Sequence, residues 1–273
     1  MSVLALVVGV SGGWSPLAGA AAGQIEAVAA VDPGAYDAYV PTATKDGQFY
    51  SYTCEFDAAW VILKTFGHDV PFEEQLEIVG LDRGPEPYYE ATADSFVVHG
   101  GDITSAFSGD YRGNMLARTT GRAMAPLFAA YGLDVEPVDT REGVQAALDG
   151  GALVWIKATV DFLPWEPVTW ITPEGEEIET VLGNDHAVVV AGYDEEVVVI
   201  RDVLGPTSSN WERPYQYEVP WDTFLAVWAA QQYDGLAVAP AADVESSDDA
   251  TDTAPEDGNG VPGIRPPDGD GGL

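Results

Sequence analysis

The stretch GQFYSYTCEFDAAWVILKTFG, residues 47–67, contains the chain's only cysteine, Cys54, where a polar loop changes to a helical pattern. Apolar side chains recur behind the cysteine at helical spacing, and Gly67 follows them as a C-terminal stop. We therefore predict a helix that begins near Cys54. The unpaired N–H groups and the dipole of a helix N-terminus favour a thiolate, so Cys54 is either a nucleophile or a small core residue.

The rest of the pattern predicts an α+β fold with helices first and strands later. Further helices are expected at FEEQLEIVG, at TGRAMAPLFAAYG despite its proline, at REGVQAALDGG with Thr140 as N-cap, and at VPWDTFLAVWAA. Runs rich in β-branched residues predict strands at ALVWIKATV, HAVVVAGY, EVVVIRDV and GLAVAP, and DFLPWEPVTWITPEGEEIETVLG predicts a hairpin. A helical half carrying the cysteine is thus expected to pack on an antiparallel sheet.

A nucleophilic cysteine needs a base, and the chain has three histidines. His68 follows the stop of the cysteine helix, at the end far from Cys54, and His99 lies in a region without a clear pattern. His186 opens a predicted strand, and a second strand runs to Asp202. A turn centred on Asp194 would place His186 opposite Asp202 on one face of the sheet, although a shift of one residue would break this pairing. The alternative is an edge histidine with no catalytic role.

This order of Cys, His and Asp resembles that of papain-like cysteine peptidases. It is most similar to the bacteriocin-processing, double-glycine leader peptidase family, whose members carry a glutamine six residues before the cysteine, as Gln48 stands here. Three further stretches resemble that family: FGHDVPFEEQLEIVG, NDHAVVVAGYDEEVVVIRDVLGP and VPWDTFLAVW. The resemblance spans roughly residues 42–240.

The resemblance implies a papain-like fold and a role for each of four residues. Cys54 would attack the substrate, His186 would accept and return the proton, and Asp202 would orient the imidazole. Gln48 would donate its amide to the oxyanion, together with the backbone N–H of Cys54. The substrate would be a peptide or protein, and neither a metal nor a cofactor is implied.

Two residues after the cysteine depart from the family, which has glycine and another small residue where this chain has Glu55 and Phe56. The Glu55 charge would disfavour a neighbouring thiolate, and Phe56 would narrow the cleft. As substrate-binding residues we name Trp165 and Trp170, which could wall the cleft or fill the core, and Asp185, which precedes His186 and would favour the imidazolium.

Composition limits the partners. The 273 residues have a formal net charge of −34, which makes nucleic acid and anionic membranes poor partners. A single cysteine excludes an internal disulfide and a thiolate zinc cluster. No segment reaches the roughly 18 uninterrupted apolar residues of a membrane span. The oligomeric state is left open.

The two ends differ from the middle. Residues 1–22 resemble a signal peptide that lacks its positive segment, which favours a secreted or cell-surface protein over a cytoplasmic one. Residues 23–41 predict an extended lead-in, residues 42–240 the peptidase-like domain, and residues 241–273 an acidic disordered tail.

Three functions compete on this sequence. The first is a cysteine peptidase, with an amidase or acyl transferase using the same residues as a variant. The second is a non-catalytic module that binds peptide in an acidic, aromatic cleft, which Glu55 favours and the coexistence of Gln48, Cys54, His186 and Asp202 opposes. The third is calcium binding by Asp-rich stretches of the tail, which lack the full EF-hand spacing.

Overall fold

A computed structural model describes residues 32–93 and 95–241. The signal-like residues 1–22 and the acidic tail after Ala241 lie outside the described residues, so those two predictions stay predictions. Of the predicted lead-in, the described part forms a short 3₁₀ turn, η1 (Pro33–Ala35), and a strand, β1 (Ala38–Tyr39). β1 pairs with the end of β10 (Asp185–Tyr193), so this segment joins the main sheet.

The main sheet is antiparallel in every pair, with the order β12-β11-β10-β7-β13-β6 and β1 at the edge of β10. Its other strands are β6 (Leu133–Pro137), β7 (Leu153–Thr159), β11 (Val197–Arg201), β12 (Gln216–Pro220) and β13 (Gly235–Pro240). The four strands predicted from β-branched runs are all present, and β6 and β12 are additional. The α+β prediction is therefore confirmed.

The five α-helices of the described chain occupy the predicted segments. They are α1 (Cys54–Thr65), α2 (Phe72–Val79), α3 (Gly121–Ala130), α4 (Arg141–Asp149) and α5 (Trp221–Ala230). Thr140 caps α4 as expected, because its hydroxyl accepts a hydrogen bond from the N–H of Gly143 at 3.1 Å. α3 continues through Pro126, which lies inside the helix.

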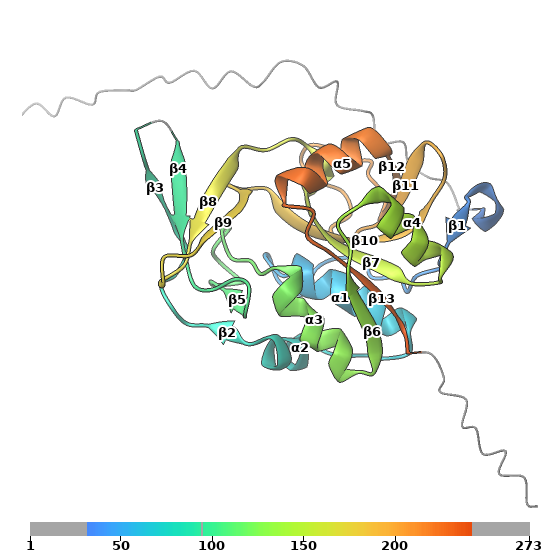
Figure 1. Cartoon of the computed structure of the whole chain (residues 1–273), viewed down its shortest axis with the longest axis horizontal. Coiled ribbons are helices and arrows are strands. Elements are labelled where there is room, and N and C mark those ends of the chain that lie inside the picture. Colours follow the sequence, from blue (N-terminus) through green and yellow to red (C-terminus); the bar gives the residue numbers. More distant parts are fainter. Residues whose placement is uncertain (1–31, 94, 242–273) are drawn as a thin grey trace, which may run out of the picture. The chain divides into compact units, whose positions relative to one another are not determined.

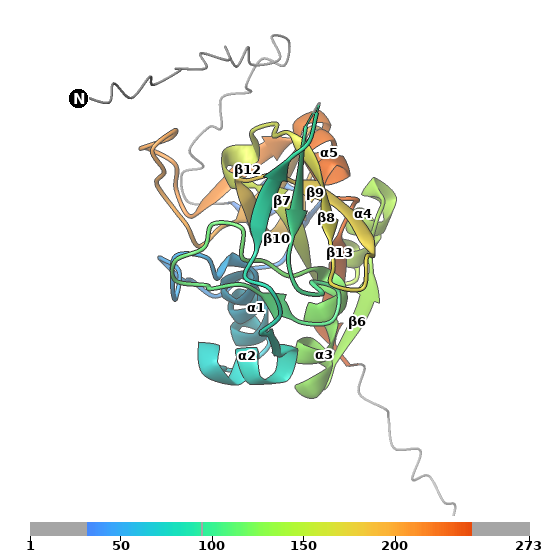
Figure 2. The same cartoon turned by 90° about the vertical axis from the view of Figure 1, so that its left-hand side faces the viewer.

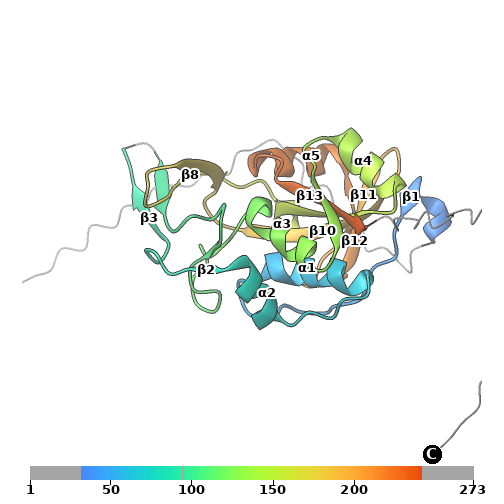
Figure 3. The same cartoon turned by 60° about the horizontal axis from the view of Figure 1, so that its bottom comes forward.

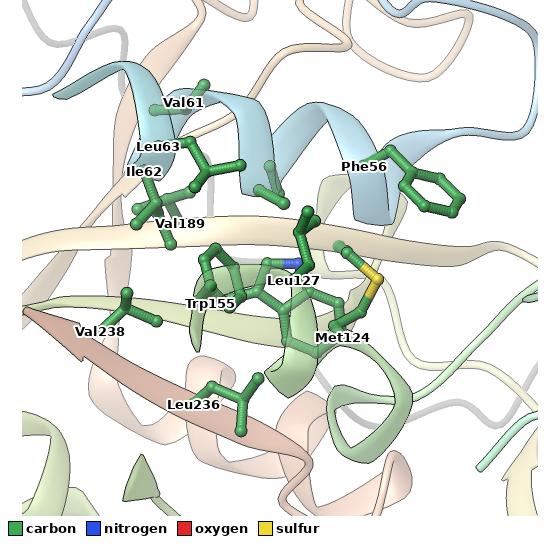
Figure 4. Close-up of a cluster of buried hydrophobic side chains, with 14 of the residues drawn as sticks. Phe56, Val61, Ile62, Leu63, Met124, Leu127, Trp155, Val189, Leu236 and Val238 are labelled. Carbon is green, nitrogen blue, oxygen red and sulfur yellow. The ribbon is translucent and has the colours of Figure 1, made fainter. Parts of the chain in front are cut away.

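Two cores lie on the two faces of the main sheet. The α1-side core packs α1, α2 and α3 against the sheet, and the α5-side core packs α4 and α5 against the other face. Figure 3 shows α1 and α2 below the sheet and α4 and α5 above it. In the α1-side core the indole of Trp155 lies beneath α1 near Leu127 and Met124 (Figure 4). Along β10, Ala187 and Val189 face α1, whereas Val188 and Val190 face α5.

The hairpin of β10 and β11 has a different register from the one predicted. Val189 pairs with Arg201, and a bulge between Val190 and Gly192 shifts the pairing closer to the turn. The turn is also longer than expected, since the N–H of Asp194 bonds to the carbonyl of Val197. The prediction that His186 lies directly opposite Asp202 is therefore wrong. The observed register differs from the predicted one by two residues, however, so the side chains of His186 and Asp202 still face the same side of the sheet.

A second, four-stranded sheet was not expected beyond its hairpin. Its strands are β3 (Tyr88–Ala91), β4 (Phe96–His99), β8 (Pro167–Ile171) and β9 (Glu177–Val181), in the order β3-β4-β8-β9. β8 and β9 form the hairpin predicted around PEGEE. This sheet lies to the left of the main sheet in Figure 1 and toward the viewer in Figure 2. Its own small core includes Val98, Val168 and Trp170.

The remaining elements are short. β2 (Leu81–Asp82) and β5 (Phe107–Ser108) form a parallel pair, and the 3₁₀ turn η2 (Val160–Phe162) follows β7. Among the described helices, none combines the length and the apolar character that crossing a bilayer requires.

Candidate active site

Cys54 is the first residue of α1, as predicted. The preceding residue, Thr53, takes the N-cap position without a side-chain hydrogen bond to the helix backbone. The loop before it is folded back, because the Tyr50 N–H donates to the Thr53 hydroxyl at 3.0 Å. Only 5% of Cys54 is exposed. The sulfur therefore has the helix-terminal position that a nucleophile needs but little contact with solvent.

The thiol of Cys54 donates a hydrogen bond to Oε2 of Glu55, with 3.2 Å between the two atoms. Burial raises the pKa of the Cys54 thiol well above its usual range, and the Glu55 carboxylate raises it further, while Lys157 acts in the opposite direction. The thiol is thus protonated at neutral pH in this structure. The activated thiolate expected at a helix N-terminus is not the state found.

Glu55 belongs to a buried ionic cluster made of Glu55, Lys157 and Asp185. Lys157 Nζ lies 2.7 Å from Glu55 Oε1 and 2.6 Å from Asp185 Oδ2, and the side chains are 0 to 5% exposed. The burial of Asp185 favours its neutral form, but Lys157 outweighs this and holds the pKa of Asp185 below its usual value. One ammonium thus compensates two carboxylates beside the sulfur.

His186 and Asp202 form a second buried pair, with 2.9 Å between Nε2 and Oδ1. Asp202 has three further partners: the Leu204 N–H at 2.8 Å, the Tyr217 hydroxyl at 2.9 Å and Arg213 Nη1 at 3.1 Å. Burial alone would raise the pKa of Asp202, but His186 and Arg213 outweigh it and hold that pKa well below its usual range.

The ionised Asp202 carboxylate decides which nitrogen of His186 can act as a base. Because a carboxylate only accepts hydrogen bonds, Nε2 carries the proton in the neutral ring and Nδ1 has the free lone pair. Nδ1 is the atom that would take a proton from a nucleophile. The predicted pairing of His186 with Asp202 is present in the structure, although it is diagonal rather than directly across the hairpin.

The two clusters meet at the start of β10 but are not joined by a hydrogen bond between the thiol and the imidazole in the described chain. Asp185 and His186 are consecutive in the strand, so their side chains leave it on opposite faces. Asp185 belongs to the cluster around Cys54, and His186 belongs with Asp202 and Tyr217. The two groups therefore lie on opposite faces of β10, at consecutive residues.

Gln48 lies half-buried in the loop before α1, and its neighbours fix that loop at both sides. The Gly47 N–H donates to the carbonyl of Val203 at 2.8 Å, next to Asp202. The Phe49 N–H donates to Oδ1 of Asp57 in α1 at 2.9 Å. The Gln48 backbone is thereby held between α1 and the end of β11. Its side-chain amide makes no hydrogen bond to the described residues.

Of the residues named for substrate binding, only Trp165 is open to solvent, with 45% of its surface exposed. Trp170 is fully buried in the small sheet, and its indole N–H donates to the carbonyl of Gly101 at 2.9 Å. Asp185 is also enclosed, because Gln231 Nε2 lies 2.7 Å from its other oxygen. Phe56 packs against Phe72 and Phe107 inside the core, so it does not narrow a cleft. Trp170 and Asp185 thus have structural contacts in place of the expected ones with substrate.

The other two histidines do not join either cluster. His68 packs against Tyr131, and His99 lies in β4, stacked on Tyr88, with Nε2 3.1 Å from Glu90. Within residues 32–93 and 95–241, no three His, Cys, Asp or Glu side chains are grouped as a metal site would require.

Sequence reasoning missed Lys157, Arg213 and Tyr217. Lys157 had a signal, because it is the one charged residue in the apolar strand ALVWIKATV and a buried lysine needs acidic partners. Arg213 and Tyr217 had none, since they come from an irregular segment and from a strand that the pattern did not predict.

The fold places this chain among α+β proteins with the architecture of a C39-like peptidase. A solved structure with this fold is that of a "putative C39-like peptidase" from Bacillus anthracis, which matches with a TM-score of 0.57 and 18% identity over 74% of this chain and 96% of that chain. Residues 37–236 match the model of the Peptidase_C39 like family, and the chain belongs to that family.

A curated relative carries the same resemblance at the level of sequence. It is YvpB of Bacillus subtilis (strain 168), described as uncharacterized, which is 30% identical over 125 residues, or 44% of this chain. The matched part covers 49% of YvpB, so the resemblance spans about half the length of that relative.

Proposed function

We propose that this protein hydrolyses peptide bonds with Cys54 as nucleophile, His186 as general base and acid, and Asp202 as the residue that orients the imidazole. The observation that carries the proposal is the buried His186–Asp202 pair, which is held by Tyr217 and Arg213 and leaves Nδ1 as the free basic nitrogen. Membership of the Peptidase_C39 like family supports it. The cysteine at the first position of α1 supports it as well.

In the proposed reaction Cys54 Sγ is first brought to Nδ1 of His186, which faces the other side of β10 in this structure. The Cys54 proton then passes to Nδ1, and the thiolate attacks the peptide carbonyl. The oxyanion is stabilised by the Cys54 backbone N–H and by the Gln48 amide, after a rotation of that side chain. His186 then returns the proton to the leaving amine, and an acyl-enzyme forms on Cys54. Water attacks this thioester with His186 as base, which releases the acid and restores the thiol.

A second candidate is a peptidase-like module that binds peptide without cleaving it. The observation that favours it is the buried thiol, whose pKa is raised and which donates its proton in a hydrogen bond to Glu55. The same triad could also serve an amidase or an acyl transferase, because the described residues do not identify the acyl donor. We further propose that the protein works at the cell surface or after secretion.

The test is turnover of a complex peptide mixture, followed by mass spectrometry of the products. We expect cleavage by the wild type and none by Cys54→Ala or His186→Gln, while His68→Gln cleaves as the wild type does. Products that persist in Cys54→Ala would overturn the proposal. Peptides that bind without being cut by the wild type would establish the binding module in its place.

A further inference from the structure

Glu55 is shared between the thiol and a buried lysine. Its Oε2 accepts the hydrogen bond of the Cys54 thiol at 3.2 Å. Its Oε1 lies 2.7 Å from Lys157 Nζ and accepts the Thr119 N–H at 3.2 Å. The two carboxylate oxygens thus have different partners. Lys157 and Thr119 hold Oε1, and this fixes the orientation in which Oε2 accepts the hydrogen bond from the sulfur.

The backbone of Glu55 is fixed as firmly as its side chain. Its carbonyl accepts the indole N–H of Trp155 at 3.1 Å, and Trp155 is fully buried in the α1-side core. Lys157 follows Trp155 on the same face of β7. Strand β7 therefore contacts both the backbone carbonyl and the side-chain carboxylate of Glu55, the residue that accepts the thiol hydrogen bond.

The charges around the sulfur come from several elements. α1 contributes Glu55, β7 contributes Lys157, and β10 contributes Asp185, with His186 on the other face of that strand. Arg118 and Asp234 also interact electrostatically with Lys157 and Asp185. Removing Glu55 or Lys157 changes the local charge by one unit in opposite directions, which makes their effects on the thiol separable.

We propose that Glu55, oriented by Lys157, is a positioning residue that holds the Cys54 side chain as a hydrogen-bonded thiol in the resting protein. The inference rests on the proposed function only for the use of that thiol as a nucleophile.

The experiment measures the rate of Cys54 alkylation by iodoacetamide against pH in the folded full chain, without substrate. Glu55→Gln keeps the shape, can still accept from Lys157, and presents an amide N–H to the sulfur. We expect its pH midpoint to lie about one unit or more below that of the wild type. Lys157→Met should move the midpoint upward, because it leaves two buried carboxylates beside the thiol.

The double variant Glu55→Gln with Lys157→Met should return toward the wild-type midpoint, and it guards against misfolding of the lysine variant alone. Lys64→Met, on the same helix as Cys54, breaks the exposed pair with Asp69; it is the matched control and should leave the midpoint unchanged. If the cluster only supported the fold, Glu55→Gln and Lys157→Met would move the midpoint in the same direction. That result, or an unmoved midpoint in Glu55→Gln, would overturn the inference.

Peptide turnover separates this inference from the proposed function. A shifted midpoint in a protein that cuts no peptide would sustain the role of Glu55 and reject the peptidase. Peptide turnover together with an unmoved midpoint in Glu55→Gln would support the peptidase and reject the role of Glu55.

Discussion

At the scale of single residues, Asp202 decides what His186 can do. A carboxylate buried without partners would become protonated and could no longer orient an imidazole. Here the Leu204 N–H, the Tyr217 hydroxyl and the Arg213 guanidinium all contact it, and it stays ionised. Tyr217 and Arg213 contact Oδ2, the oxygen that His186 does not use, so they would act on the proposed reaction through the position of His186.

Tyr217→Phe tests this support directly. The change removes the hydroxyl that donates to Oδ2 of Asp202 at 2.9 Å and leaves Arg213 in place. We expect the free energy of unfolding to fall by about 1–2 kcal/mol, as measured by urea denaturation, and the turnover number to fall as well. Tyr193→Phe is the matched control, because it removes a hydrogen bond to Asp149 far from His186. A similar loss of turnover in both variants would contradict the role of Tyr217.

At the scale of elements, the N-terminus of α1 depends on one carboxylate. Asp57 accepts the Phe49 N–H at 2.9 Å and the Thr53 hydroxyl at 2.7 Å, and it pairs with Lys45 at 3.1 Å. These contacts fasten the loop that contains Gln48 to the helix that begins at Cys54. Asp57 thus helps to set the separation between Gln48, the proposed oxyanion donor, and Cys54, the proposed nucleophile.

Asp57→Ala should release this loop. We expect faster amide hydrogen exchange at residues 45–53 and a stability loss of about 1–3 kcal/mol, because two donors and a lysine lose a buried partner. Peptide turnover should fall while exchange in β10 and β7 stays unchanged. Asp69→Ala, at an exposed position beyond the far end of α1, is the control and should change neither the exchange at residues 45–53 nor the turnover. Unaltered exchange at residues 45–53 would show that Asp57 does not hold the loop.

The contact between α1 and β10 depends on small side chains. Ala187 lies fully buried on the α1 face of the strand, one position after His186. Ala187→Leu should destabilise the protein by about 1–3 kcal/mol through overpacking, measured by urea denaturation. Ala125→Leu, on a less buried position of α3, serves as the control and should cost less. Equal costs would mean that α1 does not depend on close approach to β10.

At the scale of the whole molecule, this strongly acidic chain, with a formal net charge of −34, places two of its acids, Asp57 and Asp234, inside the fold. Burial raises the pKa of Asp57 and of Asp234 to about 6, against the hydrogen bonds and lysines that act in the other direction. The native state therefore keeps these protons to a higher pH than the unfolded chain does. Since the native state binds more protons in this range, the contribution of each group to stability falls as pH rises from about 4 to about 6.

Asp234→Asn should weaken this dependence on pH. The Asp234 carboxylate accepts the Gly121 N–H at the start of α3, and this hydrogen bond offsets part of the effect of burial, so we expect a modest effect. Relative to wild type, the variant should gain about 1–2 kcal/mol of stability between pH 4 and pH 7, measured by urea denaturation across pH. Asp134→Asn, on an exposed position of β6, is the control and should show no such gain. A constant difference between variant and wild type across pH would refute the expectation for Asp234.

Local patterns were sufficient for the regular elements. The helix at Cys54 and the strands at 185–193 and 197–201 have strong periodicity or β-branched runs, and they were predicted. The small sheet was not, because all four residues of β3 are exposed and show no apolar alternation, and because β4 pairs with a strand about seventy positions later. The register of the β10–β11 hairpin was missed since a bulge and a longer turn have no clear signal in VVVAGYDEEVVV.

A resemblance carried by Gln48, Cys54, His186 and Asp202 predicted the family and its fold, and periodicity predicted the regular elements, because residue order and local pattern can both be read from the sequence. The orientation of the Glu55 carboxylate that accepts the thiol hydrogen bond was decided by tertiary packing. Lys157 stands about a hundred positions from Glu55, and only the closure of α1 onto β7 and β10 brings its charge against that carboxylate. The state of the sulfur depends on burial and on charges a few ångströms away, and both arise only when the chain has folded.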